Sequence, residues 1–288
     1  MINVSTPLPF KQVGADDGRL VFYFHGVPGA PEEIEVFDSV ARQNHVRIIC
    51  LDRFVADASL QGEAYYRHLA KQIERIAGER PVEFIGFSIG GFVAIKTLQY
   101  MSKQITHLYL VSAAAPLNSG NDLQMMAGKR VFELVQYSQS VFRLFACVQR
   151  LLAFLFPSVL FGVLFLNAAG YDLALSGNPE FQHRMKKVLR NSFRKPIAGY
   201  VRELSAYVQH WGACLPAVAV TTSIWHGDAD NWSPICMADY FESSITKCTS
   251  KHVLAGRSHY SCLYEAVPKI LAPCERFANQ SRATNHKV

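Results

Sequence analysis

Hydrophobic residues along the chain form short, continuous apolar runs that are separated by amphipathic stretches. Six runs have the length and the content of β-branched or aromatic residues typical of strands: RLVFYFH (19–25), VRIICLD (46–52), VEFIGF (82–87), HLYLVSA (107–113), SIWHG (223–227) and KHVLA (251–255). Most of them do not alternate between apolar and polar residues, so both faces of these strands should be covered. This pattern predicts a mostly parallel sheet.

The stretches between the runs have helical spacing. EAYYRHLAKQIERIAGE (63–79) repeats apolar residues at helical intervals and ends near Gly78, and GFVAIKTLQYMSKQ (91–104) begins at a diglycine. Strands that alternate with helices form a parallel sheet with helices on both faces. The predicted fold class is therefore α/β, with a doubly wound, mostly parallel sheet.

The alternation breaks after VSAAAPL (111–117). A long stretch rich in Leu, Phe and Arg separates the fourth predicted strand from the fifth. We expect this stretch, residues 116–215, to form an inserted helical cap between two parts of one core, 1–115 and 216–279. The last residues, 280–288, are polar and are expected to form a frayed tail.

One apolar segment in the expected cap, residues 151–171, carries no charge and is about long enough to span a bilayer. A single crossing would separate two strands of one sheet, so we expect no transmembrane span. Pro157 predicts two short helices or one bent helix. Their apolar side chains are expected to pack on the core and roof a pocket, although the cap could also seal itself and line no pocket: Phe154, Leu155, Phe156, Leu160, Phe161, Leu164 and Phe165.

The charge distribution gives little support for a nucleic-acid partner. The formal net charge of +6 is spread over the chain, and the one dense basic stretch is HRMKKVLRNSFRK (183–195). It lacks interleaved stacking aromatics and does not belong to a recognisable binding module. We therefore interpret it as the solvated face of a helix and expect no binding of nucleic acid.

Cysteine usage and the N-terminus predict a cytoplasmic protein. The seven cysteines form no C-x-x-C pair and no His–Cys spacing typical of a metal site, which favours free thiols in a reducing compartment. The first 18 residues contain no basic region followed by an apolar one, so no secretory signal is expected.

The stretch EFIGFSIGGF (83–92) places Ser88 between Gly86 and Gly90, where a predicted strand meets a predicted helix. A nucleophile elbow is a tight strand-to-helix turn of this kind, with small residues two positions before and after the serine. The turn exposes the serine Oγ above the sheet edge, and the N–H of Ile89 faces developing negative charge. The setting favours Ser88 as a nucleophile over an ordinary serine at a strand end.

A serine nucleophile needs a base and an acid that orients the base. His259 follows the last predicted strand in VLAGRSHYS (253–261), a position that suits a general base. Asp228 and Asp230 lie in the polar loop after SIWHG, and either could hold the imidazole. Alternatively, both aspartates could only satisfy turn and N-cap amides.

A second oxyanion donor is expected from the segment HGVPG (25–29) at the end of the first predicted strand. The Gly-Pro-Gly turn can bring the backbone N–H of Val27 toward Ser88, so Val27 and Ile89 would form a two-donor oxyanion hole. His25 is expected to brace this loop by hydrogen bonding rather than to react.

With these motifs the chain resembles the α/β-hydrolase superfamily over about residues 19–277, with serine, acid and histidine in the superfamily's order. Three motifs are similar to a bacterial group of α/β-hydrolases: H-G-x-P-G (25–29), W-H-G-x-x-D (225–230) and LAGRSH (254–259). In that group the last aspartate of G-x-x-D is the triad acid, so the resemblance implies Asp230. It likewise implies Val27 as an oxyanion donor.

Two segments depart from the group's pattern. DRFVADAS (52–59) lacks both glycines of the usual D-R-P-G-x-G-x-S, so this loop is expected to line the pocket differently. Ser258 stands directly before His259, where a glycine is common. Serine rather than aspartate at position 88 argues against epoxide hydrolases and haloalkane dehalogenases, because a serine attacks carbonyl carbons.

The resemblance implies an α/β-hydrolase fold with an inserted helical cap and a cytoplasmic serine hydrolase with catalytic Ser88, Asp230 and His259. The expected substrate is a carboxylic ester of a lipophilic small molecule, with thioester or lactone as near variants, and no metal or organic cofactor is expected. The same residues could instead serve C–C bond hydrolysis or acyl transfer. A non-catalytic binding protein on a hydrolase scaffold is the remaining alternative.

Overall fold

A computed structural model describes residues 6–101, 104–117 and 122–272 of the protein. Within this part of the chain, seven strands form one sheet in the order β1-β3-β2-β4-β5-β6-β7. Their bounds are β1 Phe10–Gly14, β2 Arg19–Phe24, β3 Val46–Leu51, β4 Val82–Phe87, β5 Ile105–Val111, β6 Thr222–Gly227 and β7 Cys248–Leu254. The strands β2 to β7 pair in parallel, which confirms the predicted fold class.

The strand β1 was not predicted from the sequence. It pairs antiparallel with β3 at the edge of the sheet, and most of its five residues are exposed or half-buried. The segment FKQVG contains only two large apolar residues, so it lacks the continuous run that identifies the buried strands.

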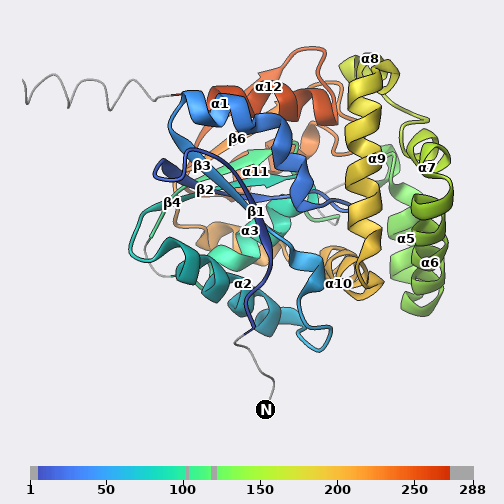
Figure 1. Ribbon diagram of the computed structural model, residues 1–288, viewed down its shortest axis with the longest axis horizontal. Coiled ribbons are helices and arrows are strands. Elements are labelled where there is room, and N and C mark those ends of the chain that lie inside the picture. Colours follow the sequence, from blue (N-terminus) through green and yellow to red (C-terminus); the bar gives the residue numbers. More distant parts are fainter. Residues whose placement is uncertain (1–5, 102–103, 118–121, 273–288) are drawn as a thin grey trace, which may run out of the picture.

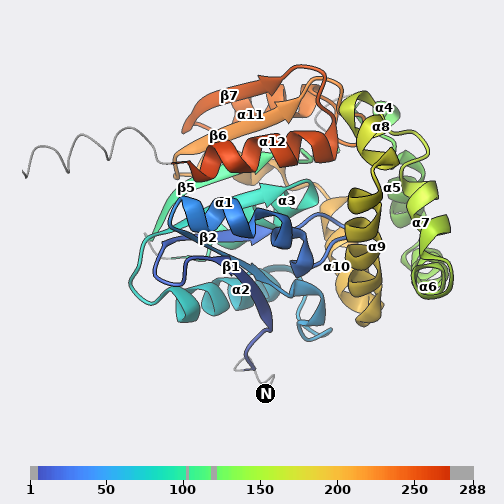
Figure 2. The same ribbon diagram turned by 45° about the horizontal axis from the view of Figure 1, so that its top comes forward.

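Helices cover both faces of the sheet (Figures 1 and 2). On one face lie α1 (Asp38–Gln43) and α12 (His259–Leu271), and on the other lie α2 (Gly62–Ala77), α3 (Ile89–Leu98) and α11 (Cys236–Ser244). Short 3₁₀ helices follow two of the strands, η1 (Pro31–Phe37) after β2 and η2 (Arg53–Val55) after β3. The core is apolar because the central strands are buried on both sides.

A group of helices joins β5 to β6 and lies together at one end of the sheet (Figure 2). It comprises α4 (Asp122–Met125), α5 (Lys129–Tyr137), α6 (Gln139–Leu155), α7 (Pro157–Leu164), α8 (Gly170–Gly177), α9 (Pro179–Arg194), α10 (Ile197–Tyr207) and η3 (Gly212–Ala217). These helices occupy the interval in which the cap is expected. The expected tail, 280–288, and Cys274 lie outside the described residues.

The long apolar segment is divided into two helices at the predicted place. Helix α6 ends at Leu155 and α7 begins at Pro157, and within the described ranges no helix is long and apolar enough to cross a membrane. The expected packing is wrong for part of the segment, because three of its side chains are exposed to solvent, Phe154 by 46%, Leu155 by 60% and Phe156 by 56%. Phe154 and Leu155 lie on the exposed side of α6 and Phe156 lies between α6 and α7, whereas Phe161 of α7 and Phe165 after it are buried.

Candidate active site

Ser88 lies on a tight turn between β4 and α3. Its backbone has φ +56° and ψ −131°, a conformation that costs a non-glycine residue free energy. Gly90 lets the turn approach β2, because a Cβ there would lie 2.1 Å from the carbonyl oxygen of Phe24. Gly86 is equally constrained, since its Cβ would lie 2.6 Å from the Cα of Gly91. The turn therefore requires both glycines of GFSIG.

His259 is the first residue of α12 and is paired with a buried acid. Its Nδ1 lies 2.9 Å from Asp230 Oδ2, and both residues are almost fully buried. The other oxygen of Asp230 accepts hydrogen bonds from the backbone N–H groups of Trp232, at 2.9 Å, and Ser233, at 3.0 Å. Asp230 is thus held in place by its own loop while it orients the imidazole.

The environment of Asp230 favours its ionised form. Burial alone would raise the pKa of Asp230, but the charge and hydrogen bond of His259 and the N–H of Ser233 outweigh it and lower the pKa below its ordinary value. Asp228 is in a different position. It is exposed, and its carboxylate accepts a hydrogen bond from Gly256 N–H at 2.7 Å. Of the two candidate acids, Asp230 is the one beside His259.

Ser88 and His259 line the same cavity, although no hydrogen bond joins their side chains in the described part of the chain. The cavity encloses about 350 Å³, including the solvent at its mouth. Its walls carry no charged side chain: Gly26, Val27, Pro28, Phe87, Ser88, Leu164, Phe165, Leu189, Trp232, His259 and Tyr260. In the described residues no group of three or more His, Cys, Asp or Glu side chains is placed to hold a metal ion.

The expected oxyanion donors, Val27 and Ile89, lie near this cavity. Val27 lines it directly, and Ile89 is the first residue of α3, where a helix leaves its N–H groups without intrahelical partners. Neither N–H is hydrogen-bonded to another described residue. Of the two, Ile89 lies at the N-terminus of a helix, which favours negative charge.

No protein-family model matches the chain, and no curated protein matches its sequence. Solved structures do match. An esterase from Exiguobacterium antarcticum has a TM-score of 0.64 over 96% of this chain and 94% of its own, at 16% identity. The enol-lactonase from Burkholderia xenovorans has 0.66 over 92% and 94%, at 13% identity. An alpha/beta hydrolase enzyme from a Medee basin deep-sea metagenome library has 0.65 over 91% and 90%, at 13% identity. The protein has the α/β-hydrolase fold.

Within this α/β-hydrolase fold, one buried acid that supports the site was missed in the sequence. Asp172 of α8 accepts hydrogen bonds from the backbone N–H groups of Tyr260, at 2.9 Å, and Ser261, at 2.7 Å. It therefore caps the N-terminus of α12, where His259 lies. A signal was present, because Asp172 is the first charged residue after the uncharged segment, but the sequence does not show which helix it reaches.

The loop after β3, which departs from the usual glycine-containing motif, connects to the cap in this α/β-hydrolase fold. Arg53 donates two hydrogen bonds of 2.9 Å to the carboxylate of Glu203 on α10 and one of 3.0 Å to the carbonyl oxygen of His25. Arg53 and Glu203 are both fully buried. The described lining of the Ser88 cavity includes no residue of this loop, and Arg53 of the loop binds Glu203 on the cap helix α10.

The other departure, Ser258, has a negative φ. Its backbone has φ −111° and ψ −150°, a conformation that needs no glycine. Its N–H donates a 2.8 Å hydrogen bond to Ser261 Oγ at the start of α12.

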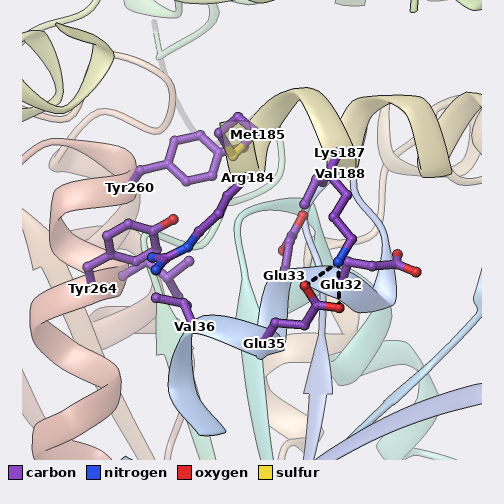
Figure 3. Close-up of a pocket in the computed structure, with 11 residues that line it drawn as sticks. Glu32, Glu33, Glu35, Val36, Arg184, Met185, Lys187, Val188, Tyr260 and Tyr264 are labelled. Atoms are coloured by element: carbon purple, nitrogen blue, oxygen red, sulfur yellow. Dashed lines mark hydrogen bonds and ion pairs between the residues drawn. The ribbon is translucent and has the colours of Figure 1, made fainter. Parts of the chain in front are cut away.

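A second cavity adjoins the first at Tyr260, which lines both. Figure 3 shows this cavity between η1, α9 and α12, with the ammonium group of Lys187 bonded to the carboxylate of Glu35. It encloses about 400 Å³ with its opening and, unlike the Ser88 cavity, is lined by charged residues of both signs. Glu33 forms part of its wall and is the residue that reaches the HGVPG loop.

Glu33 and His25 hold the HGVPG loop from within. Glu33 Oε2 accepts hydrogen bonds from Tyr23 Oη, at 3.0 Å, and from the N–H of Gly26, at 3.4 Å. His25 Nδ1 lies 2.7 Å from the carbonyl oxygen of Gly26. Burial, with the nearby charge of Arg53, lowers the pKa of His25 well below its ordinary value. The buried, uncharged imidazole thus contacts the loop backbone, as expected for a brace.

Substituting Glu33 by glutamine is expected to remove part of the pH dependence of stability. Burial raises the pKa of Glu33 to about 7 although its hydrogen bonds with Tyr23 and Gly26 oppose the shift. Between the ordinary pKa of 4.5 and this value the folded protein binds more protons than the unfolded chain, so the free energy of unfolding falls as pH rises. The fall should be about 3 kcal/mol and should be absent in Glu33→Gln.

Urea unfolding at pH values below and above this window measures the effect. The matched control is Glu79→Gln, because Glu79 is exposed. Equal pH dependence in Glu33→Gln and Glu79→Gln would contradict the prediction.

Proposed function

We propose that the protein is a serine hydrolase that cleaves a carboxylic ester, thioester or lactone of a lipophilic small molecule through an acyl-enzyme intermediate. One arrangement carries the proposal. Ser88, on its strained turn, and His259 line the same cavity, and His259 Nδ1 is paired with the carboxylate of buried Asp230. A nucleophile, a base and an orienting acid are the parts that acyl transfer requires. Residues 116–215 would act as the cap over a core of 1–115 and 216–279.

In the acylation step, Ser88 Oγ would attack the carbonyl carbon of the ester while His259 Nε2 takes the hydroxyl proton. Val27 and Ile89 would donate their backbone N–H groups to the carbonyl oxygen as it becomes an oxyanion. The bond between the carbonyl carbon and the alkoxy oxygen then breaks, and the alcohol leaves with the proton from His259. The acyl group remains as an ester on Ser88.

In the deacylation step, His259 would take a proton from water, and the resulting hydroxide attacks the acyl carbon. Ser88 Oγ leaves and recovers the proton from His259, which releases the carboxylic acid. Asp230 stays ionised through both steps and stabilises the imidazolium form of His259. The lowered pKa of Asp230 supports this role.

The lining of the cavity supports a lipophilic substrate. Leu164 and Phe165 come from α7 and its C-terminal end, Leu189 comes from α9, and Trp232 stacks near His259 with ring centroids 5.8 Å apart. Apolar walls with a few polar groups are typical of small-molecule sites. These cap residues favour the roofed-pocket alternative over a cap that lines no pocket.

A fluorophosphonate probe tests the proposal. The probe phosphonylates activated serines, so mass spectrometry of the treated protein should find one adduct on Ser88. The adduct should be lost in His259→Ala and retained in His183→Ala, a matched control on the outer part of α9. Absence of labelling in folded protein would overturn the hydrolase proposal and favour the binding-protein alternative.

C–C bond hydrolysis and acyl transfer are separated by products. A labelled protein that releases free acid from an ester in water is a hydrolase, whereas release that requires an added alcohol or amine acceptor identifies an acyltransferase. Turnover of a diketone but not of esters would identify C–C bond hydrolysis.

Turnover is expected to rise with the length of the acyl chain. Each methylene buried against Leu164, Phe165 and Leu189 can contribute up to about 0.8 kcal/mol, so kcat/KM should rise a few-fold per methylene until the cavity is full. A panel of p-nitrophenyl esters from acetate to decanoate measures this. Fastest turnover of the acetate, with a decline at every added carbon, would contradict the lipophilic cavity.

A further inference from the structure

Helix α6 is apolar on two opposite sides, and only one of them is covered. Its inner side, with Phe142, Ala146 and Ala153, is buried, and α6 packs against α9 and α10. Its outer side carries an exposed stripe with the spacing of one helix face: Val141, Leu144, Val148, Leu151 and Leu155. Leu144 is 67% exposed and Leu151 is 57% exposed. A helix with a second apolar side implies a second partner.

The exposed apolar surface continues from α6 into α7. Phe156, Val159 and Val163 are each more than half exposed. In the sequence from Phe156 to Val163, one residue is polar, a serine. We call these three residues and the stripe of α6 the outer cap face. Figures 1 and 2 show α6 and α7 at the outer edge of the molecule, with α9 between them and the sheet.

The charged residues that flank the outer cap face have one sign. Arg143 and Arg150 are exposed on α6 about 100° around the helix from Leu144 and Leu151, so they flank the stripe, and neither forms an ion pair with a described residue. From Ser138 to Asn178 the one acidic residue is Asp172, which is buried and bonded to α12. The face is therefore apolar and flanked by cationic side chains, and residues 138–178 add no exposed carboxylate.

This combination points to an anionic lipid surface rather than a second copy of the chain. In a symmetric dimer through α6 the second copy would present the same surface, which offers no exposed carboxylate between residues 138 and 178 to pair with Arg143 and Arg150. A helix that lies in a membrane interface places apolar side chains below the headgroups and cationic ones among anionic headgroups. Since no described helix could span a membrane, the contact would be in the plane of the surface.

We propose that the outer cap face docks the protein on the surface of an anionic lipid bilayer, with α6 and α7 lying in the interface. The proposal does not depend on the hydrolase activity. It would nevertheless place the lipid beside the cavity, because Leu164 and Phe165, which line the cavity, directly follow Val163 of the face. A lipophilic molecule dissolved in the bilayer would then have a short path to Ser88.

Co-sedimentation of the full chain with vesicles tests the docking. Vesicles of phosphatidylcholine alone are compared with vesicles of phosphatidylcholine and phosphatidylglycerol. We expect binding to the anionic vesicles that is roughly tenfold stronger and that weakens as salt is added. In Arg143→Gln/Arg150→Gln this preference for anionic lipid should disappear.

A matched pair of variants tests whether vesicle binding requires the outer cap face or only exposed apolar residues in general. Leu151→Glu should lower binding to anionic vesicles roughly tenfold or more. Val253→Glu introduces the same charge at a site of similar exposure, 48%, on β7, and should leave binding unchanged. Circular dichroism and thermal melting show that both variants are folded.

Three outcomes would overturn the proposal. Equal binding by Leu151→Glu and Val253→Glu, or no binding of the unmodified protein to either vesicle, excludes docking through this face. A dimer in sedimentation velocity that dissociates in Leu151→Glu, without vesicle binding, assigns the face to a second copy of the chain.

Discussion

Substituting Ser88 by alanine is expected to lower kcat on any ester that the protein cleaves by roughly 10⁴-fold or more. The reason is that the proposed mechanism has no other group that can form the acyl-enzyme. The remaining turnover would come from binding and from the N–H groups of Val27 and Ile89, which are unchanged in the variant. His259→Ala should cause a similar loss, and the double variant should be little worse than either single one, because the residues act as a unit.

The measurement is kcat with a p-nitrophenyl ester, together with the melting temperature of each variant. Ser243→Ala, at an exposed position on α11, is the matched control and should retain full activity. Retention of more than a small fraction of activity in Ser88→Ala would show that a different residue is the nucleophile.

Substituting Asp230 by asparagine is expected to lower kcat by roughly 10³- to 10⁴-fold, somewhat less than the loss of Ser88. The carboxylate Oδ2 contacts His259 Nδ1 at 2.9 Å while Oδ1 accepts two backbone N–H groups. An asparagine that keeps its oxygen toward the backbone N–H groups turns its NH₂ toward Nδ1. The imidazole would then carry its proton on Nε2 and could not accept the proton of Ser88.

Asp228→Asn is the control within the same loop. Its side chain is exposed and accepts one N–H, so the substitution should change kcat only a few-fold. The assignment of the acid is wrong if Asp228→Asn is the more damaging of the two substitutions. If both variants are equally active as the unmodified protein, His259 is not oriented by either carboxylate.

The strands and the helix break could be predicted because their signals are local. The central strands β2, β3 and β4 are runs of apolar residues buried on both faces, and Pro157 has a fixed φ that suits the first turn of a new helix. The edge strand β1 has no such run and depends on pairing with β3. The exposure of Phe154, Leu155 and Phe156 could not be predicted from the local sequence either. An apolar residue does not show whether another part of the chain will cover it.

In the candidate site, too, some residues could be predicted from the sequence and others could not. Ser88 and His259 lie in short motifs at strand ends, and the parallel sheet brings such ends to one edge. The partners of Asp172 and of Arg53 could not be predicted from the local sequence, because they are distant in the chain: Asp172 meets α12 across 88 residues and Arg53 meets Glu203 across 150. A buried polar group needs a partner, but the sequence does not name it.

By itself, then, the sequence determined the parallel sheet, the turn at Ser88 and the order of the candidate serine, acid and histidine, because periodicity and glycine content act over a few residues. Spacing left Asp228 and Asp230 open and the family resemblance implied Asp230, which the structure places against His259. Only the tertiary structure decided that Leu164 and Phe165 line the cavity while Phe154 faces solvent, and that Asp172 caps α12. These outcomes depend on which surfaces meet when the cap packs on the sheet, and that packing is set by contacts between residues far apart in the chain.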